Sequence, residues 1–198
     1  MVLAELGQTF VNALALSVSE AWTTYQGLRT REPGITGAFT QRTSANILHD
    51  LIWKTMMREL DGKHSYTLHD KYPLRFIERT VKDGRTYAIR LKRHRDNAVS
   101  SYSTQADRRF YAGGVQRELD GLEKVNLAAG YRWDCELERV ECAVISYREG
   151  KSDVVWAVEP AVAGVGVAPV LRPQKAMAPQ RDLFDFVTPG VLEAGVVR

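Results

Sequence analysis

The stretch "FIERTVKDGRTYAIRLKR", residues 76 to 93, has two runs of β-forming residues on either side of Asp83 and Gly84. Asp-Gly is a pair that a two-residue type I′ turn favours, because both central residues need positive φ angles. We therefore predict a β-hairpin at this point. Such a turn would pair Lys82 with Arg85, and it would fix the register of both strands outward from there.

The predicted turn also decides on which face of the hairpin each side chain lies. Four apolar residues fall on one face, Phe76, Tyr87, Ile89 and Leu91, and four cations fall on the other, Arg75, Arg79, Arg90 and Lys92. Arg75 would then stand opposite Lys92, and like charges in that position destabilise a sheet unless a partner or solvent compensates them. Arg93, His94 and Arg95 continue the positive patch.

Clustered arginine and lysine side chains bind phosphates. We therefore predict a nucleic-acid-binding surface made of Arg75, Arg79, Arg90, Lys92, Arg93 and Arg95. A sheet face that is merely solvated, and a surface for an acidic protein, are the alternatives.

Two amphipathic helices are predicted before the hairpin. From Leu3 to Leu28, apolar residues recur at steps of three and four, and Gly27 together with "REPG" at 31 to 34 ends the pattern. The same spacing recurs from Thr43 to Leu60, and the "DG" pair at 61 and 62 ends it. We interpret the apolar stripes of both helices as core packing.

After the hairpin, the sequence predicts one short helix and three more strands. Thr104 and Asp107 form a loose capping pattern, and the glycine pair at 113 and 114 ends the helix. The runs 125–133, 139–147 and 153–159 are rich in Val, Ile, Tyr and Trp, which is typical of an antiparallel meander. The predicted fold is therefore α+β, with two N-terminal helices followed by a mostly antiparallel sheet of about five strands.

The composition changes after residue 160. The stretch "AVAGVGVAPVLRPQKAMAPQ", residues 161 to 180, is made of small residues punctuated by proline, which favours a linker over a core. We predict a single α+β domain over residues 1–160, a linker over 161–179, and a C-terminal extension or partner-binding peptide over 180–198.

The extension begins with "QRDLF", residues 180 to 184, followed by Asp185 and Phe186. This pentad resembles the bacterial sliding-clamp-binding peptide, whose pattern is Gln, often Leu, then Ser or Asp, then Leu and Phe. The resemblance implies that Gln180 enters a polar pocket, that Leu183 and Phe184 fill an apolar cleft, and that Asp182 holds the turn between them. Arg181 departs from the frequent Leu. We predict a partner-binding set of Gln180, Asp182, Leu183, Phe184 and Phe186, the alternative being that these residues fold back onto the domain.

Composition bounds the class of protein. The chain has 198 residues, 44% of them hydrophobic and 26% charged, and its formal net charge is +3. These values are typical of a folded globular chain, so charge distribution is more informative than total charge. The N-terminal stretch lacks a basic region and a block of apolar residues, so we expect a cytoplasmic protein that does not enter a membrane.

No catalytic signature is present. The sequence has no GxSxG or GxxxxGK[ST] motif, and Pro169 replaces the third glycine that a dinucleotide site after Gly164 and Gly166 would need. Cys135 and Cys142 are expected to face each other across a hairpin as two buried thiols. We expect no metal and no cofactor.

A metal-dependent nuclease would need a carboxylate two residues before a lysine on a strand. Asp61 with Lys63, and Glu149 with Lys151, have that spacing but lie at a helix end and a turn, and the residue two before Lys92 is Arg90. A nuclease is therefore the weakest hypothesis. We predict a non-enzymatic, nucleic-acid-associated accessory protein of bacterial or phage type. The alternative is a regulator or inhibitor of a protein, such as an antitoxin or a phage antagonist of a host protein.

Overall fold

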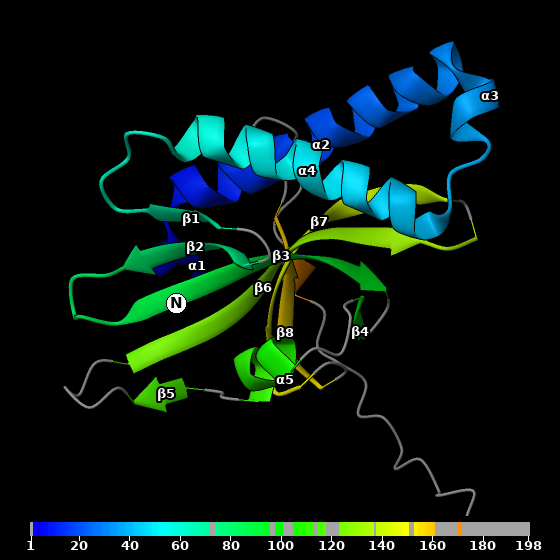
Figure 1. Cartoon of the computed structure of the whole chain (residues 1–198). Coiled ribbons are helices and arrows are strands. Elements are labelled where there is room, and N and C mark those ends of the chain that lie inside the picture. The colour runs from blue at the N-terminus through cyan, green and yellow to red at the C-terminus, as the bar shows by residue number, and fades with distance from the viewer. Residues whose placement is uncertain are drawn as a thin grey trace, which may run out of the picture.

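The computed structural model describes residues 2–71, 74–95, 98–100, 105–112, 115–117, 123–136, 138–150, 153–160 and 170–171. Within these ranges, no helix combines the length and the apolarity that crossing a lipid bilayer requires. The fold is α+β, as the sequence predicts: two long N-terminal helices pack on a mostly antiparallel sheet (Figure 1).

The described helices are α1 (Val2–Leu6), α2 (Gln8–Arg31), α3 (Pro33–Thr36), α4 (Gln41–Leu60) and α5 (Gln105–Ala112). The predicted helices over 3–28, 43–60 and 104–112 are all confirmed in position. The helix α2 continues past Gly27 to Arg31, because one glycine costs a helix only about 1 kcal/mol. The helix α4 begins where Thr40 Oγ1 accepts a hydrogen bond from the Thr43 amide at 3.1 Å.

The first predicted helix is interrupted at Gly7, which separates α1 from α2. Gly7 has a φ of 82°, a left-handed conformation that glycine adopts without strain. A Cβ at this position would lie 3.1 Å from the hydroxyl of Tyr66, which itself donates a hydrogen bond to the Leu6 carbonyl at 2.7 Å. The break therefore brings the start of α2 close to the sheet side of the domain.

The sheet has nine described strands: β1 (Thr67–Lys71), β2 (Leu74–Thr80), β3 (Thr86–Arg95), β4 (Ala98–Ser100), β5 (Val115–Arg117), β6 (Glu123–Asp134), β7 (Arg139–Arg148), β8 (Val154–Glu159) and β9 (Val170–Leu171). Their order is β1-β2-β3-β6-β7-β8-β9, with β4 paired to β3 and β5 paired to β6. The meander β6–β7–β8 is confirmed. The pairing of β3 with β6 is parallel, and the sequence did not predict it.

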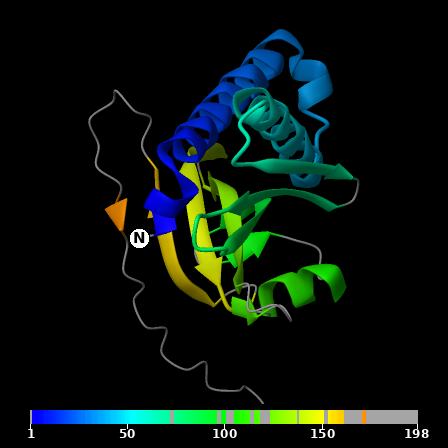
Figure 2. The same ribbon diagram turned by 90° about the vertical axis from the view of Figure 1, so that its left-hand side faces the viewer.

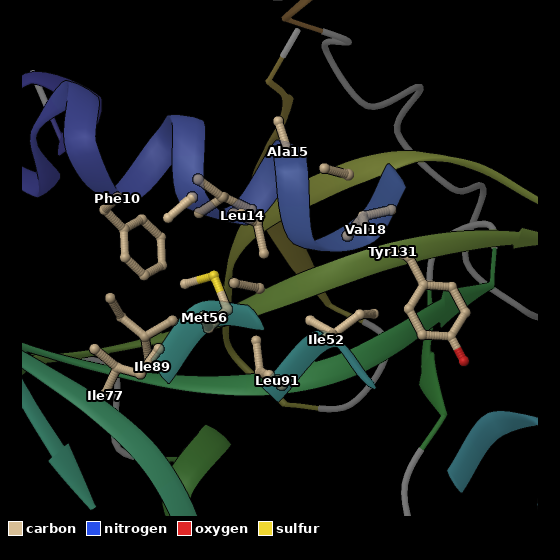
Figure 3. Packing of buried hydrophobic residues seen from close by; sticks show 14 of the residues in the cluster. Phe10, Leu14, Ala15, Val18, Ile52, Met56, Ile77, Ile89, Leu91 and Tyr131 are labelled. Carbon is tan, nitrogen blue, oxygen red and sulfur yellow. The ribbon is translucent and has the colours of Figure 1, made fainter. Parts of the chain in front are cut away.

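The helices lie in two unequal layers. Figure 2 shows α2 and α4 on one side of the sheet and α5 on the other. The larger core lies beneath α2 and α4, where Phe10, Leu14, Ile52, Met56 and Ile89 are all at most 2% exposed (Figure 3). A smaller apolar cluster of Val99, Tyr111 and Ala128 lies beneath α5. Both faces of the central strands are therefore covered.

The register of the β2–β3 hairpin differs from the prediction by one residue. Ile77 pairs with Ile89 and Arg79 pairs with Tyr87, and the turn closes through a hydrogen bond from the Val81 amide to the Arg85 carbonyl at 2.9 Å. The loop thus has three residues and ends at Gly84, whose φ is 87°. Asp83 does not adopt the positive φ that a type I′ turn requires. An Asp-Gly pair also suits a three-residue loop with glycine last, and this loop is the one that forms.

The predicted arrangement of the two cysteines is wrong. Asp134 pairs with Arg139 at the end of the β6–β7 hairpin, so Cys135 lies in the turn and is exposed, whereas Cys142 lies in β7 and is partly buried. Both thiols are free. Burial raises the pKa of the Cys142 thiol to about 11, so it stays protonated near neutral pH.

The domain boundary near residue 160 stays a prediction. Two residues of the predicted linker 161–179 are described, and they form β9, which pairs with β8. The rest of the linker and the whole extension 180–198 lie outside the described residues, including the predicted partner-binding set Gln180, Asp182, Leu183, Phe184 and Phe186.

Candidate anion-binding site

The observed register divides the predicted basic surface between the two faces of the sheet. A slip of one residue in a hairpin moves the side chains of one strand to the other face relative to its partner. The face beneath α2 and α4 carries Arg75, Arg79, Arg93 and Arg95, and the face beneath α5 carries Arg90 and Lys92. The prediction that Arg75, Arg79, Arg90 and Lys92 share one face is therefore wrong.

Arg75 and Arg79 connect the sheet to the helices. Arg75 donates hydrogen bonds to Asp50 of α4 and, at 2.8 Å, to Asp70 of β1, and the hydrogen bond to Asp50 raises its pKa. Arg79 donates to the Glu5 carbonyl, and its guanidinium lies 4.8 Å from the ring centroid of Tyr66. Both cations are thus occupied by contacts within the domain.

Arg90 and Lys92 are held by one carboxylate of α5. Asp107 Oδ1 accepts from Arg90 Nη1 at 2.8 Å and from Lys92 Nζ at 3.2 Å. The Arg90 guanidinium also lies 4.2 Å from the ring centroid of Phe110. Their side chains are only 13% and 18% exposed, so neither points freely to solvent as the sequence had indicated.

Arg93 and Arg95, like Arg79, have no share in the carboxylates that hold the other three predicted cations. Neither has a carboxylate partner among the residues that the structure describes. Arg95 Nη2 donates to Gln41 Oε1 at 3.1 Å, and the Nε atoms of both arginines are buried with no hydrogen-bond partner within the described ranges. Arg93 and Arg95 thus lie two residues apart on one face of β3, where no described carboxylate balances their charge.

The beginning of α4 lies beside these two arginines. Gln41, the acceptor of the Arg95 hydrogen bond, is the first residue of this 20-residue helix. The first amides of a helix lack acceptors within it and carry a partial positive charge, which favours an anion nearby. Tyr25 of α2 donates a hydrogen bond of 2.7 Å to the Oγ atom of Ser44, which lies in the first turn of α4.

Tyr131 of the neighbouring strand β6 lies beside Arg93. It pairs with Arg93 in the parallel β3–β6 register, and it is 3% exposed. Among the residues that the structure describes, its hydroxyl has no hydrogen-bond partner. Burial raises the pKa of Tyr131, so the group is a neutral donor at ordinary pH. We call Arg93, Arg95, Gln41, Ser44 and Tyr131 the α4 site.

The face beneath α5 holds a buried polar network instead. His94 Nδ1 lies 3.2 Å from the Lys92 carbonyl, which can only accept, so Nδ1 carries the proton and Nε2 accepts from Ser146 Oγ at 3.0 Å. Ser146 Oγ in turn accepts from Arg148 Nε at 2.9 Å. Burial, reinforced by the charge of Arg148, lowers the pKa of His94 to about 3.

This network does not form a catalytic serine–histidine pair that a substrate could reach. Ser146 is 0% and His94 1% exposed, so both are closed to solvent. Burial lowers the pKa of Arg148 to about 10, which still leaves it charged. The sequence placed His94 in a positive surface patch, and that interpretation is wrong because the side chain is buried and neutral.

Two other features offer less chemistry. A pocket of about 290 Å³ lies between α2 and β7, and it is lined by Ala15, Val18, Ser19, Trp22, Val140, Glu141, Cys142, Ala143 and Pro160. Glu141 is its only carboxylate. No group of three or more potential metal ligands occurs in the described part of the chain, and Asp61, which the nuclease hypothesis considered, follows the last residue of α4 at an exposed position.

Most of the α4 site was invisible to sequence analysis. Only Arg93 and Arg95 were predicted, because they extend a run of cations. Tyr131 lies in a strand of buried residues, where a tyrosine cannot be distinguished from ordinary core, and Gln41 and Ser44 carry no pattern of their own. Neither a protein-family model nor a solved structure matches this chain, so its function has to be inferred from the α4 site.

Proposed function

We propose that this chain is a non-enzymatic binding protein that contacts the phosphates of a nucleic acid through Arg93 and Arg95. One observation carries the proposal: these two arginines have no carboxylate partner in the described part of the chain, whereas Arg75 and Arg90 are neutralised within the domain. A guanidinium presents several donors in a rigid plane, which matches the oxygens of a phosphate.

The neighbouring helix supports the same ligand. A helix N-terminus adds an attractive partial charge, and the hydrogen bond from Arg95 to Gln41 holds one guanidinium next to it. The proposal of a non-enzymatic role is supported by the burial of the Ser146–His94 pair, which closes this serine–histidine arrangement to a substrate.

Direct titration with oligonucleotides tests this proposal. Wild type and the double variant R93A/R95A are titrated with single-stranded DNA, duplex DNA and RNA, with binding followed by fluorescence anisotropy from about 50 to 200 mM salt. The variant should bind at least about tenfold more weakly, and its salt slope for duplex DNA should fall by about 0.9 for each phosphate that it no longer neutralises.

The matched control is R29A/R31A, which removes the same charge from the exposed end of α2. It should change affinity by much less than the double variant at positions 93 and 95. Equal losses in the two variants would mean that only net charge matters, and unchanged affinity in R93A/R95A would overturn the proposal. A thermal melt of each variant confirms that the fold is retained.

The C-terminal pentad supports a second proposal, that a protein partner is captured by residues 180 to 186. Its support is the resemblance of Gln180, Asp182, Leu183 and Phe184 to a clamp-binding peptide. The variant L183A/F184A should lose capture of a purified bacterial sliding clamp while the thermal midpoint stays the same, and Q180A should weaken capture as well. Full capture by the double variant would contradict this proposal.

The salt dependence of binding distinguishes a nucleic-acid-binding protein from the alternative, a regulator that binds a protein. Binding through phosphates weakens steeply as salt rises, whereas an apolar protein interface depends little on it. A partner that is retained at high salt after nuclease treatment would favour the regulator.

A further inference from the structure

The hydroxyl of Tyr131 is a polar group whose position in the core needs an explanation. The residue is 3% exposed, and its oxygen has no hydrogen-bond partner in the described part of the chain. A buried donor without a partner costs about 1–3 kcal/mol, so most are satisfied in native proteins. A phenylalanine would fill the same space without that cost.

The hydroxyl belongs to the α4 site rather than to the apolar cluster. Figure 3 shows Tyr131 at the edge of the core, with its hydroxyl pointing away from Leu14 and Val18 of α2. Arg93 and Tyr25 are the neighbours that influence its ionisation, and the tyrosine at position 25 is bonded to Ser44 in the first turn of α4. The unpaired donor thus lies among the groups that favour an anion.

We infer that the α4 site takes a phosphate monoester at the end of a nucleic-acid strand, with Tyr131 donating to a phosphate oxygen that Arg93 and Arg95 also contact. This inference rests on the proposed function and names its ligand more closely. The partly exposed side chains of Arg93 and Arg95 can change rotamer to admit the group.

The burial of the Tyr131 hydroxyl is the reason for proposing the end of a nucleic-acid strand as the ligand. A phosphodiester inside a strand carries a sugar on each side, so it cannot reach a donor that is almost completely buried. A terminal phosphate has one substituent, three free oxygens and a charge of about −1.5 to −2 near neutral pH. Two guanidinium groups, one neutral hydroxyl and a helix N-terminus supply donors from several directions for such a group.

Competition with unlabelled oligonucleotides tests the inference. The same single-stranded sequence is prepared with a 5′-phosphate, with a 3′-phosphate and with hydroxyls at both ends, and the corresponding nucleoside monophosphate is added as a fourth competitor. Wild type should bind one phosphorylated strand at least about tenfold more tightly than the strand without phosphate. Y131F should lose this preference, and a Y131F variant that keeps it would overturn the role of Tyr131.

Stability separates a ligand-binding role from a structural one. Y131F removes a hydroxyl without a partner, so its thermal midpoint should be equal to that of wild type or higher. Y25F is the matched control for stability, because it removes a hydroxyl that bonds Ser44, so it should lower the midpoint.

The outcomes are distinct. Equal affinity for phosphorylated and unphosphorylated strands in wild type would overturn end recognition and leave the proposed function standing. Competition by the mononucleotide as strong as by the phosphorylated strand would also overturn it, because the ligand would then be a free nucleotide. Failure of every oligonucleotide to bind would overturn the proposed function and this inference together.

Discussion

Asp107 of α5 and Arg90 of β3 are joined by a hydrogen-bonded ion pair of 2.8 Å, and both side chains are less than one-sixth exposed. The same Asp107 oxygen also accepts from Lys92, so two cations of the sheet share one carboxylate. The short helix α5 is therefore attached to the sheet by charge as well as by the apolar contact of Tyr111 with Val99 and Ala128.

Removal of this carboxylate is expected to destabilise the domain. D107A leaves the charges of Arg90 and Lys92 without their shared acceptor at partly buried positions, which should lower the free energy of unfolding by about 2–3 kcal/mol. Urea unfolding followed by circular dichroism measures the change. The control K54A, an exposed cation of α4, should stay within about 0.5 kcal/mol of wild type. A D107A variant as stable as wild type would mean that α5 does not depend on this ion pair.

Gly130 of β6 is expected to tolerate no side chain. Its φ is +147°, and a Cβ there would lie 2.1 Å from the Lys92 carbonyl oxygen of the neighbouring strand. G130A should therefore force β3 and β6 apart and lower the free energy of unfolding by about 3 kcal/mol or more.

The matched control for this change is G27A. Gly27 lies inside α2, and a Cβ added there would have no heavy atom within 4 Å, so alanine should raise the free energy of unfolding by about 0.5–1 kcal/mol. The two variants make the same chemical change with opposite expected signs, and thermal melts compare them directly. A mild effect in G130A would show that β3 and β6 separate locally at little cost.

His94 should make the protein sensitive to acid. Its pKa is about 3 in the folded chain and near 6.5 when exposed, so only the unfolded chain takes up a proton between these values. Stability from this group is therefore complete above pH 6.5 and is lost as pH falls towards 3. At pH 5 the loss is about 2 kcal/mol, from 1.36 kcal/mol for each pH unit below 6.5.

The variant H94Q isolates this contribution. It should be less stable than wild type at pH 7, because it disturbs the hydrogen bonds to Ser146 and to the Lys92 carbonyl. The difference between the two proteins should then shrink by about 2 kcal/mol from pH 7 to pH 5, since the remaining titratable groups are common to both. A difference that is constant with pH would show that His94 is protonated in the folded chain.

The sequence predicted the elements of this fold well and their arrangement only in part. Periodicity located α2, α4 and the strands β6 to β8, because each has an apolar face that packs on one core. The hairpin was found for the right residues, yet its register was not, since Asp83 and Gly84 are compatible with loops of two and of three residues. This difference of one residue in loop length determines on which face of the sheet Arg75 and Arg90 lie.

The residues of the candidate site were likewise predicted only in part from the sequence. Arg93 and Arg95 stand out in the sequence as part of a cationic run, but their lack of acidic partners among the described residues depends on where Asp50, Asp70 and Asp107 lie in space. No local pattern links β6 with the start of α4, so Tyr131 could not be assigned to the site. The parallel pairing of β3 with β6 is what brings them together.

That parallel pairing also has a consequence for how the chain folds. In the set β1 to β3, each strand pairs with the next one along the chain, and the same holds for β6 to β8. Each set can therefore form by closing short loops. The contact between β3 and β6 spans residues 96 to 122, so it closes a longer loop than the pairings within either set. We therefore expect docking of the two halves to limit the refolding rate, so that substitutions where Leu91 meets Ala129 slow refolding more than substitutions in the hairpin turn at Asp83.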